Sequence, residues 1–510
     1  MMDTSAMDRT SGQTAATLLE LLEGPPDSAP AIVVPDGPEL SYGALRRQVR
    51  RTADALAEFG IGRGDRVALV LPNGAEVIIA FLGAAVAATA APLNPGYTED
   101  EFRFYLDDTD AKAVIVPPGG AAAARAAAGS RMVIETALDP DGEMRFSSTT
   151  ARQPGRTASP PSSEDVALVL HTSGTTSRPK RVPLKHRNLT ASVEHIVDTY
   201  ALTSDDVALC VMPLFHVHGL VASTLSTLST GGTVVVPPRF DPLGFWSLLT
   251  GQRVTWYTAV PTIHQLVLAR SGRRADTKTQ LRFVRSCSSA LAPATMGALE
   301  KLLGVPVLEA YGMTEAAHQM ASNPLPPAPR VPGSVGHGTG VRIAIMDEAG
   351  QLLPVGTHGE VVIQGPNVTD GYENNPEANA AGFTDGWFRT GDLGTLDDAG
   401  YLTLLGRLKE LINRGGEKIA PREIDEVLLL HPAVGEAVAF GLPHRVWGEE
   451  VAVAVVLKGE ASEADLLSYC REHLAEFKVP RKLFVVASIP RTATGKVQRR
   501  HVAAEFGGQG

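Results

Sequence analysis

Amphipathic helical segments alternate with short runs of β-branched residues along most of this chain. Residues 42–59 place apolar side chains at helical spacing, and residues 66–71 and 233–236 are typical of buried strands. Strands that are separated by helices form βαβ units, which build parallel sheets covered by helices. The pattern therefore predicts an α/β fold with parallel-type sheets and flanking helices.

The organisation of the chain changes near residue 406. A turn-rich strand region, residues 392–406, is followed by a charged helical segment, and the last hundred residues contain strand-like residues 451–457 and helix-like residues 463–477. A chain of 510 residues is normally divided into more than one domain. We predict a large N-terminal domain, residues 1–408, and a small α+β C-terminal domain, residues 409–510.

Composition argues against several classes of protein. The net charge of −10 disfavours broad binding to nucleic acid or to anionic lipid. Three scattered cysteines, Cys210, Cys287 and Cys470, are too few for a disulfide framework and predict free thiols. The longest apolar run, residues 77–91, is too short for a membrane span and fits a buried helix. We expect a cytoplasmic protein without nucleic-acid or membrane partners.

A strand that leads into a loop of small hydroxylated residues is the strongest local signal. Residues 166–170 are apolar, and residues 171–180 read HTSGTTSRPK. The backbone N–H groups and hydroxyls of such a loop, together with Lys180, are suited to holding a polyphosphate. Pro179 and Arg181 break the spacing of a P-loop, which disfavours that class of phosphotransferase. A plain polar turn is the alternative.

Three further motifs carry chemistry. Residues 309–315 (EAYGMTE) combine an aromatic ring, a hydroxyl and a carboxylate, which suits purine stacking and magnesium binding. Residues 387–392 end in Asp392, which with Arg407 could bind ribose hydroxyls, although a surface turn explains them equally well. Residues 490–500 (PRTATGKVQRR) place Lys496 on a flexible loop suited to neutralising charge in a transition state, or form a solvated basic tail.

The order of these motifs resembles the adenylate-forming superfamily of acyl-CoA synthetases, luciferases and peptide-synthetase adenylation domains. The motifs are T-S-G-T-T-x-x-P-K, Y-G-x-T-E, T-G-D, G-R-x-K and P-x-T-x-x-G-K, and the resemblance extends from about residue 15 to residue 500. Residues 214–219, 255–264 and 315–318 are similar to the oxalate-CoA ligase branch, and residues 411–419 to acyl-CoA synthetases of that kind.

The resemblance implies ATP, CoA and Mg²⁺ as cofactors and assigns roles to individual residues. The β- and γ-phosphates of ATP would be held by Thr172, Ser173, Gly174, Thr175, Thr176 and Lys180. Magnesium would lie near Thr176 and Glu315, with Thr314 beside them. The adenosine moiety would be bound by Tyr311, Ser288, Ser289, Ala290, Asp392 and Arg407. The catalytic residues would be Lys496, Glu315, Thr176 and Lys180.

The resemblance also implies two half-reactions at one site. A substrate carboxylate would attack the α-phosphorus of ATP, giving an acyl-AMP and pyrophosphate, while Lys496 bridges the developing charges. The small domain, mobile in this family, would then rotate about Lys409 and present residues 413–418 to the thiol of CoA. Gly415 and Gly416 would let the pantetheine arm lie against backbone.

The choice of acid is predicted from polar residues in the segments that resemble the oxalate branch. The predicted pocket residues are His216, His218, His264, Ser289 and His318. Imidazoles without partners would be costly to bury against an alkyl chain, so the set suits a small carboxylic acid that is polar or anionic, with oxalate favoured. For each single histidine, a core residue bonded to a backbone carbonyl is the alternative.

Two residues depart from the family pattern. Arg181 stands where the superfamily usually has Gly, and would either add a phosphate contact or obstruct the loop. Gly312 stands where the oxalate branch often carries Ala, a difference expected to shift the preference among small acids. Alternative functions are activation of another short or aromatic acid, loading of a carrier-protein thiol, and nucleotide binding without turnover. A monomer and a homodimer both fit the sequence.

Overall fold

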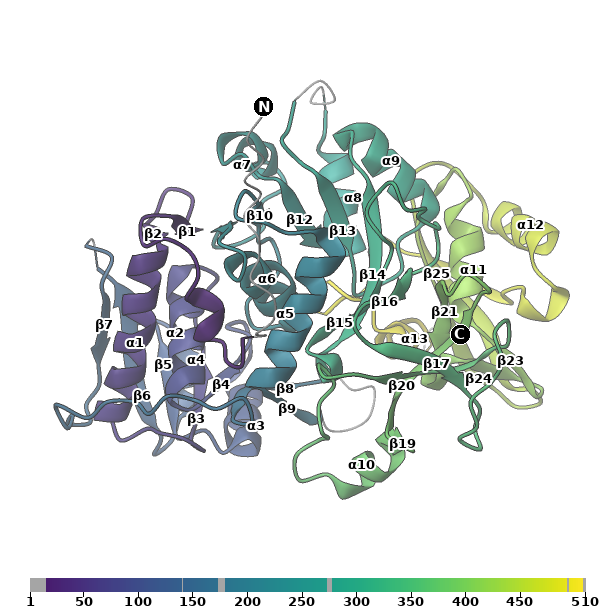
Figure 1. Ribbon diagram of the computed structural model, residues 1–510. Helices are drawn as coiled ribbons and strands as arrows, with labels where there is room; N and C mark the ends of the chain where they lie inside the picture. The colour runs from purple at the N-terminus through teal and green to yellow at the C-terminus, as the bar shows by residue number, and fades with distance from the viewer. Residues whose placement is uncertain (1–14, 140, 173–178, 273–277, 493–494, 508–510) are drawn as a thin grey trace.

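Two large sheets with parallel central strands form the framework of the N-terminal part of the chain (Figure 1). The computed structural model describes residues 15–139, 141–172, 179–272, 278–492 and 495–507. All pairings among the central strands of both sheets are parallel, and antiparallel strands lie at the edges. The predicted α/β fold with parallel sheets and flanking helices is confirmed.

The first large sheet has seven strands. Their spatial order is β7 (Met144–Ser147), β6 (Met132–Leu138), β5 (Ala113–Val116), β3 (Arg66–Leu69), β4 (Thr89–Pro92), β8 (Val166–His171) and β9 (Arg181–Lys185). The second large sheet has nine. Their order is β16 (His337–Gly338), β15 (His318–Ser322), β14 (Val307–Met313), β13 (Phe283–Ser286), β12 (Trp256–Ala259), β10 (Val207–Leu209), β11 (Thr233–Val235), β1 (Pro30–Val33) and β2 (Glu39–Ser41).

Two smaller sheets follow along the chain. The third sheet is antiparallel and contains β17 (Arg342–Met346), β18 (Gly359–Gln364), β20 (Trp387–Leu396), β19 (Phe383–Thr384) and β21 (Leu402–Arg407). The fourth contains β23 (Glu417–Ile419), β22 (Ile412–Arg414), β25 (Gly448–Leu457), β24 (Val434–His444) and β26 (Lys482–Val485). The strands of this fourth sheet all come from the last hundred residues, as expected of a separate C-terminal unit.

Helices connect and cover these sheets. In the N-terminal part they are α1 (Tyr42–Glu58), α2 (Ala75–Ala87), α3 (Glu99–Thr109), α4 (Ala122–Ala127), α5 (His186–Tyr200), α6 (Ser226–Leu228), α7 (Phe245–Gly251), α8 (Pro261–Ala269), α9 (Pro293–Leu303) and α10 (Pro376–Gly382), with short helical turns η1 (Glu20–Leu22), η2 (His218–Leu225), η4 (Thr314–Ala316) and η5 (Leu408–Glu410). The C-terminal part adds α11 (Pro421–Leu429), α12 (Glu463–His473), η6 (Glu476–Lys478) and α13 (Arg499–Gly507).

Helix α1 shows how local sequence produces these elements. The hydroxyl of Ser41 accepts a hydrogen bond from the Ala44 N–H and caps the first turn. The apolar face of α1, which includes Leu45, Val49 and Leu56, is buried in the large core shared by the two large sheets. The amphipathic pattern in the sequence therefore predicted this helix correctly.

The apolar run of residues 77–91 folds differently from the single buried helix that we expected. Helix α2 ends at Ala87, and Thr89–Pro92 form strand β4, which pairs with β3 on one side and β8 on the other. Both pieces are buried, and a continuous apolar run does not distinguish a buried helix from a buried strand. In the described ranges, no helix is long and apolar enough to cross a membrane.

The last hundred residues have cores of their own. Ile412, Ile424, Val453 and Leu466 belong to one buried cluster, and Phe440 and Val502 to another. A smaller C-terminal part therefore exists, packed beside the large one (Figure 1). The predicted boundary after residue 408 falls inside η5, between the third and fourth sheets, and stays a prediction.

Candidate active site

Two adjoining cavities open at the carboxyl edge of the nine-stranded sheet. The first has a volume of about 700 Å³ and is lined by residues that follow β12 and β13, including Thr262 and Ala290. The second, of about 840 Å³, extends toward β8 and the third sheet. Ser288, Gly312, Arg407 and Lys496 line both cavities. Ligands of open α/β sheets bind at this edge, because loops from several strands converge there.

Asp392 is held by two partners at the boundary of the cavities. Asp392 on β20 and Arg407 on β21 are directly opposite in the antiparallel register, and the Arg407 Nε donates to Asp392 Oδ1 at 3.0 Å. The hydroxyl of Tyr311, at the end of β14, donates to the other carboxylate oxygen. The carboxylate is thus fixed in orientation beside the aromatic ring of Tyr311, an arrangement suited to binding a nucleoside.

Glu315 and Lys180 are linked through Tyr372. The Tyr372 hydroxyl donates to Glu315 Oε1 at 2.8 Å, and the Lys180 ammonium lies 4.3 Å from the centre of the Tyr372 ring. Burial raises the pKa of the Glu315 carboxyl and lowers that of the Lys180 ammonium. The carboxylate, the ring and the ammonium therefore form one connected unit in the wall of the second cavity.

The loop between Thr172 and Lys180 is closed by a backbone hydrogen bond. The Thr172 N–H donates to the Lys180 carbonyl at 2.9 Å, and both residues line the second cavity beside Thr314. The predicted phosphate-binding residues Ser173, Gly174, Thr175 and Thr176, including the predicted magnesium contact of Thr176, lie outside the described residues.

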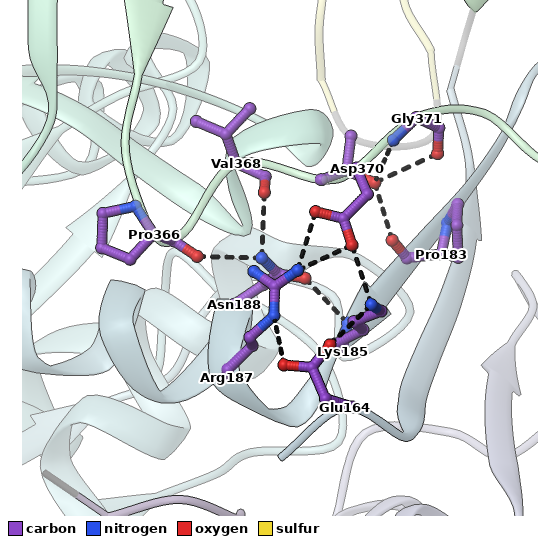
Figure 2. A network of polar contacts seen from close by, with 10 residues as sticks. Glu164, Pro183, Lys185, Arg187, Asn188, Pro366, Val368, Asp370 and Gly371 are labelled. Carbon is purple, nitrogen blue, oxygen red and sulfur yellow. Dashed lines mark hydrogen bonds and ion pairs between the residues drawn. The ribbon is translucent and has the colours of Figure 1, made fainter. Parts of the chain in front are cut away.

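A network of charged side chains surrounds Asp370, next to the residue whose backbone contacts Glu315 (Figure 2). Asp370 lies between Lys185 and Arg187, at 2.8 and 2.6 Å, and both cations also contact Glu164. Next to this network, the Thr369 N–H donates to the Glu315 carbonyl at 2.7 Å. The ion pairs therefore connect the start of α5 to the backbone that carries Glu315.

The loop that carries Lys496 is docked on the N-terminal part. The hydroxyl of Thr262, in the first turn of α8, donates to the Gly495 carbonyl at 3.2 Å and accepts from Arg491 Nη1 at 2.9 Å. Arg491 is in turn paired with Glu436 of the C-terminal sheet. Burial, and then the nearby Arg407, lowers the pKa of the Lys496 ammonium. In this conformation Lys496 reaches the boundary of the two cavities.

Three histidines meet at the inner end of the second cavity. His216 and His318 line it, and the rings of His318 and His218 are 5.0 Å apart in an edge-to-face arrangement. Burial lowers the pKa of His216 to about 3 and that of His218 and His318 well below the usual value, so all three imidazoles are neutral at physiological pH. His218 begins η2, a π-helical turn.

The other two predicted pocket residues lie elsewhere. His264 on α8 lines neither cavity; it is fully buried with its Nδ1 3.3 Å from the Tyr257 hydroxyl, and burial lowers its pKa to about 4. This placement corresponds to the alternative of a core histidine. Ser289 lines the first cavity rather than the second and is exposed, its hydroxyl donating to the Ser288 carbonyl.

Gly312 and His318 approach each other closely across the β14–β15 hairpin. A methyl group at residue 312 would lie 2.0 Å from the His318 carbonyl oxygen, and His318 itself has φ +119°. An alanine at 312 therefore requires movement of β15. The expected shift in preference among small acids stays a prediction, and the close contact suggests that it would act through the position of His318.

Arg181 lines neither cavity, which does not support the expected phosphate contact. Most of the loop that it was expected to obstruct lies outside the described residues. Arg181 lies on β9 with its side chain buried, and its guanidinium donates to the Asp108 carbonyl and approaches the Asp108 carboxylate at 3.4 Å and Glu373 at 3.8 Å. These contacts hold the Arg181 side chain against Asp108 and Glu373.

The glycines predicted to face CoA are remote from the cavities in this conformation. Gly415 and Gly416 form the turn between β22 and β23, with φ +62° and +95°, and line neither cavity. Such angles favour glycine at both positions. Lys409, in η5, lines the second cavity. One face of the C-terminal part thus meets the cavities while its glycine turn does not.

Comparison with known proteins identifies the family. The family model described as "AMP-binding enzyme" matches residues 20–373, and "AMP-binding enzyme C-terminal domain" matches residues 423–496. The chain belongs to the AMP-binding enzymes. This AMP-binding enzyme is 48% identical over 490 residues to an oxalate–CoA ligase of Arabidopsis thaliana, covering 92% of this chain and 93% of that one.

Solved structures agree with the family assignment. ATP-bound MatB from Rhodopseudomonas palustris is 33% identical and superposes with a TM-score of 0.88, over 96% of this AMP-binding enzyme and 99% of MatB. Apo MatB is 34% identical over the same shares, with a TM-score of 0.78. The arrangement of the two parts described here is therefore more similar to that of the ATP-bound form.

Sequence reasoning missed four residues that the structure brings to the site. They are Tyr372, Thr262, Thr258 and Arg285. Arg285 had a recognisable signal, because a charged residue in the middle of the buried strand β13 is unusual. The other three are ordinary residue types for the elements that carry them, and only their long-range contacts distinguish them.

Proposed function

We propose that this enzyme activates oxalate with ATP and transfers the oxalyl group to CoA, releasing AMP and pyrophosphate. The observation that carries the proposal is the polar lining of the second cavity, where His216, His318 and Ser288 occur together with Lys180 and Glu315. Neutral imidazoles and hydroxyls donate hydrogen bonds to carboxylate oxygens, whereas an alkyl chain would leave them unsatisfied. The identity to an oxalate–CoA ligase supports the same acid.

In the first half-reaction, a carboxylate oxygen of the acid attacks the α-phosphorus of ATP in line with the departing pyrophosphate. Lys180 and Thr172, with the loop between them, would hold the outer phosphates, while Tyr311, Asp392 and Arg407 would bind adenosine at the boundary with the first cavity. Lys496 lines both cavities and would neutralise the negative charge that develops between the attacking and departing oxygens.

Glu315 fits a magnesium ion that is shared with the nucleotide. Within the described residues no group of three or more histidine, cysteine or acidic side chains could hold a metal by itself. Glu315 lines the second cavity, and one or two carboxylates are the usual protein contribution to magnesium, because phosphate oxygens and water supply its other ligands. Magnesium would supply charge neutralisation on the phosphates.

In the second half-reaction, the thiol of CoA attacks the carbonyl carbon of the acyl-AMP and AMP leaves. We propose that the C-terminal part rotates about Lys409, which withdraws Lys496 and presents the Gly415–Gly416 turn to the pantetheine arm.

The three cysteines are free and buried, which supports a reducing compartment such as the cytoplasm.

The test is the formation of AMP and acyl-CoA from magnesium-ATP and CoA with different acids. The panel comprises oxalate, malonate, acetate, a medium-chain fatty acid and an aromatic acid. We expect oxalate to have the highest kcat/KM, because it is the smallest acid that presents a second carboxylate to the histidines. A higher kcat/KM for the fatty or aromatic acid would overturn the assignment of the acid, and turnover only with a carrier-protein thiol would overturn that of the acceptor.

A further inference from the structure

A fully buried arginine lies behind the histidine end of the second cavity. Arg285 is in the middle of β13, and its side chain is 0% exposed. Its hydrogen-bond partners among the described residues include Tyr200, Thr258, His318 and Gln319, and the Cys287 side chain also lies beside it; none of them is an aspartate or glutamate. A guanidinium remains protonated, and a buried charge without a counter-ion is costly. The protein therefore maintains a positive charge next to the acid pocket.

Arg285 sets the donor-to-acceptor direction in a series of hydrogen bonds that ends at the cavity. Its Nη1 donates to the Thr258 hydroxyl at 3.0 Å, and that hydroxyl lies 2.6 Å from His218 Nε2. The Thr258 hydroxyl donates its own proton to His218 Nε2, so Nε2 is an acceptor and the proton of the neutral imidazole is on Nδ1. Nδ1 is 3.2 Å from the Ser288 hydroxyl, so Ser288 accepts from His218. The Ser288 proton is then available to a ligand.

The second branch from Arg285 orients His318. Arg285 Nη2 is 3.4 Å from His318 Nδ1, and because a guanidinium only donates, Nδ1 is the acceptor. The His318 proton is therefore on Nε2. His216 follows the same rule, since its Nδ1 accepts from the His218 backbone N–H at 3.2 Å. Ser288, His318 and His216 thus each keep a donor that no partner among the described residues uses.

We propose that Arg285 is a positioning residue for the second carboxylate of the acid. Through Thr258, His218 and His318, Arg285 directs the hydrogen-bond donors of the pocket toward that carboxylate. Its guanidinium also supplies a buried positive charge, which the second carboxylate neutralises. Burial, and then Arg285 itself, keeps the pKa values of His218 and His318 low, so the imidazoles are neutral and the positive charges that act on them are those of Arg285 and, from the cavity side, Lys496. The inference rests on the proposed function, because it concerns an acid that has a second anionic group.

The first experiment compares a dianion with a monoanion of the same shape. Oxamate, the monoamide of oxalate, keeps one carboxylate for adenylation and has an uncharged amide in place of the other. We expect Arg285→Met to lower kcat/KM for oxalate about 100-fold and that for oxamate less than about 5-fold, because only the dianion loses its countercharge. Arg285→Lys should recover part of the loss.

The matched control is Arg282, three residues earlier in the chain. Its guanidinium is paired with Asp206 at 2.6 Å and is remote from the histidines. Arg282→Gln should lower the melting temperature and leave the ratio of the two kcat/KM values unchanged. An equal loss for oxalate and oxamate in Arg285→Met, or no loss for oxalate, would overturn the proposal.

A second pair of variants keeps the test valid if Arg285→Met does not fold. Thr258→Ser retains the hydroxyl that accepts from Arg285, whereas Thr258→Val has the same shape without it. We expect Thr258→Ser to discriminate oxalate from oxamate like the wild type and Thr258→Val to lose about 10-fold of that discrimination. Equal ratios in the two variants would refute the relay.

The inference and the proposed function fail in different ways. If the wild type prefers malonate, the proposed acid is wrong. The role of Arg285 is then tested by the ratio of kcat/KM for malonate to kcat/KM for its monoamide. If the preferred acid carries one carboxylate and no other anionic group, the role of Arg285 is overturned as well.

Discussion

The hydroxyl of Thr262 donates a 3.2 Å hydrogen bond to the carbonyl of Gly495, the residue before Lys496. Thr262 is on α8 of the N-terminal part and Gly495 is near the end of the chain, so this bond crosses between the two parts of the molecule. A Cβ atom at residue 495 would lie 3.2 Å from the Val260 side chain, so the loop docks closely. The contact belongs to the conformation in which Lys496 lies at the cavities.

Removing this contact should slow only the first half-reaction. Thr262→Val deletes the donor to Gly495 and the acceptor for Arg491 while keeping the shape of the side chain. We expect pyrophosphate-ATP exchange to fall about 10-fold, and thioester formation from prepared acyl-AMP to remain within about 2-fold. Thr262→Ser is the matched control. Equal losses in both half-reactions would contradict a docking role.

Lys496 should contribute most of the charge neutralisation during adenylation. We expect Lys496→Ala to reduce pyrophosphate-ATP exchange by about 100- to 1000-fold, because a preorganised cation in a buried site is lost. Lys478→Ala removes a lysine of the same part that is paired with Glu423, and should have no effect. Unchanged exchange in Lys496→Ala would remove this residue from the mechanism.

Tyr372 should connect magnesium binding to phosphate binding. Tyr372→Phe loses the donor to Glu315 but keeps the ring near Lys180, so we expect about a 10-fold lower adenylation rate and a higher magnesium requirement. Tyr372→Leu also loses the ring and should be slower still. The control is Tyr401→Phe, because the Tyr401 hydroxyl donates to the Pro329 carbonyl outside the cavities. A magnesium requirement identical to that of the wild type would count against the link.

Lys409 should act as the hinge between the two half-reactions. Proline restricts φ and would hinder the backbone rotation that we propose at this residue. We therefore expect Lys409→Pro to impair thioester formation more than adenylation, with Lys409→Ala as the control for loss of the side chain alone. The two half-reactions are measured separately, and an equal decrease in both would place the hinge elsewhere.

Glu309 should make the stability of the protein depend on pH. Burial raises its carboxyl pKa from 4.5 to about 7, although the Gly333 N–H opposes the shift. Between pH 4.5 and 7 the folded state binds more protons than the unfolded state, so the free energy of unfolding decreases as pH rises through this range. The decrease is on the order of 3 kcal/mol.

Glu309→Gln tests this dependence because glutamine does not titrate. We expect the variant to melt at a higher temperature than the wild type at pH 8 and at nearly the same temperature at pH 5. Melting curves at both pH values measure the effect. A constant difference between variant and wild type at the two pH values would show that ionisation of Glu309 is not its cause.

Much of the fold was predictable because it depends on local patterns. Helix α1 was expected at residues 42–59 and is found at Tyr42–Glu58, since its capping serine and apolar face are encoded within a few turns. The antiparallel third sheet was not predicted, because its pairings join strands such as β17, β18 and β20 through contacts that no local period encodes. Strand β4 was missed for the same reason.

The candidate site divides in the same way. The sequence by itself determined the chemistry that is present: a loop with Lys180, the carboxylates Glu315 and Asp392, and Lys496 in a recognisable order. Only the tertiary structure decided which of these residues meet, because Lys496 and the histidines are brought together by contacts between distant parts of the chain. It placed His216 and His318 at the cavity and His264 in the core, although all three are histidines in similar apolar surroundings. It also placed Arg285 next to them, where burial keeps its permanent charge away from solvent.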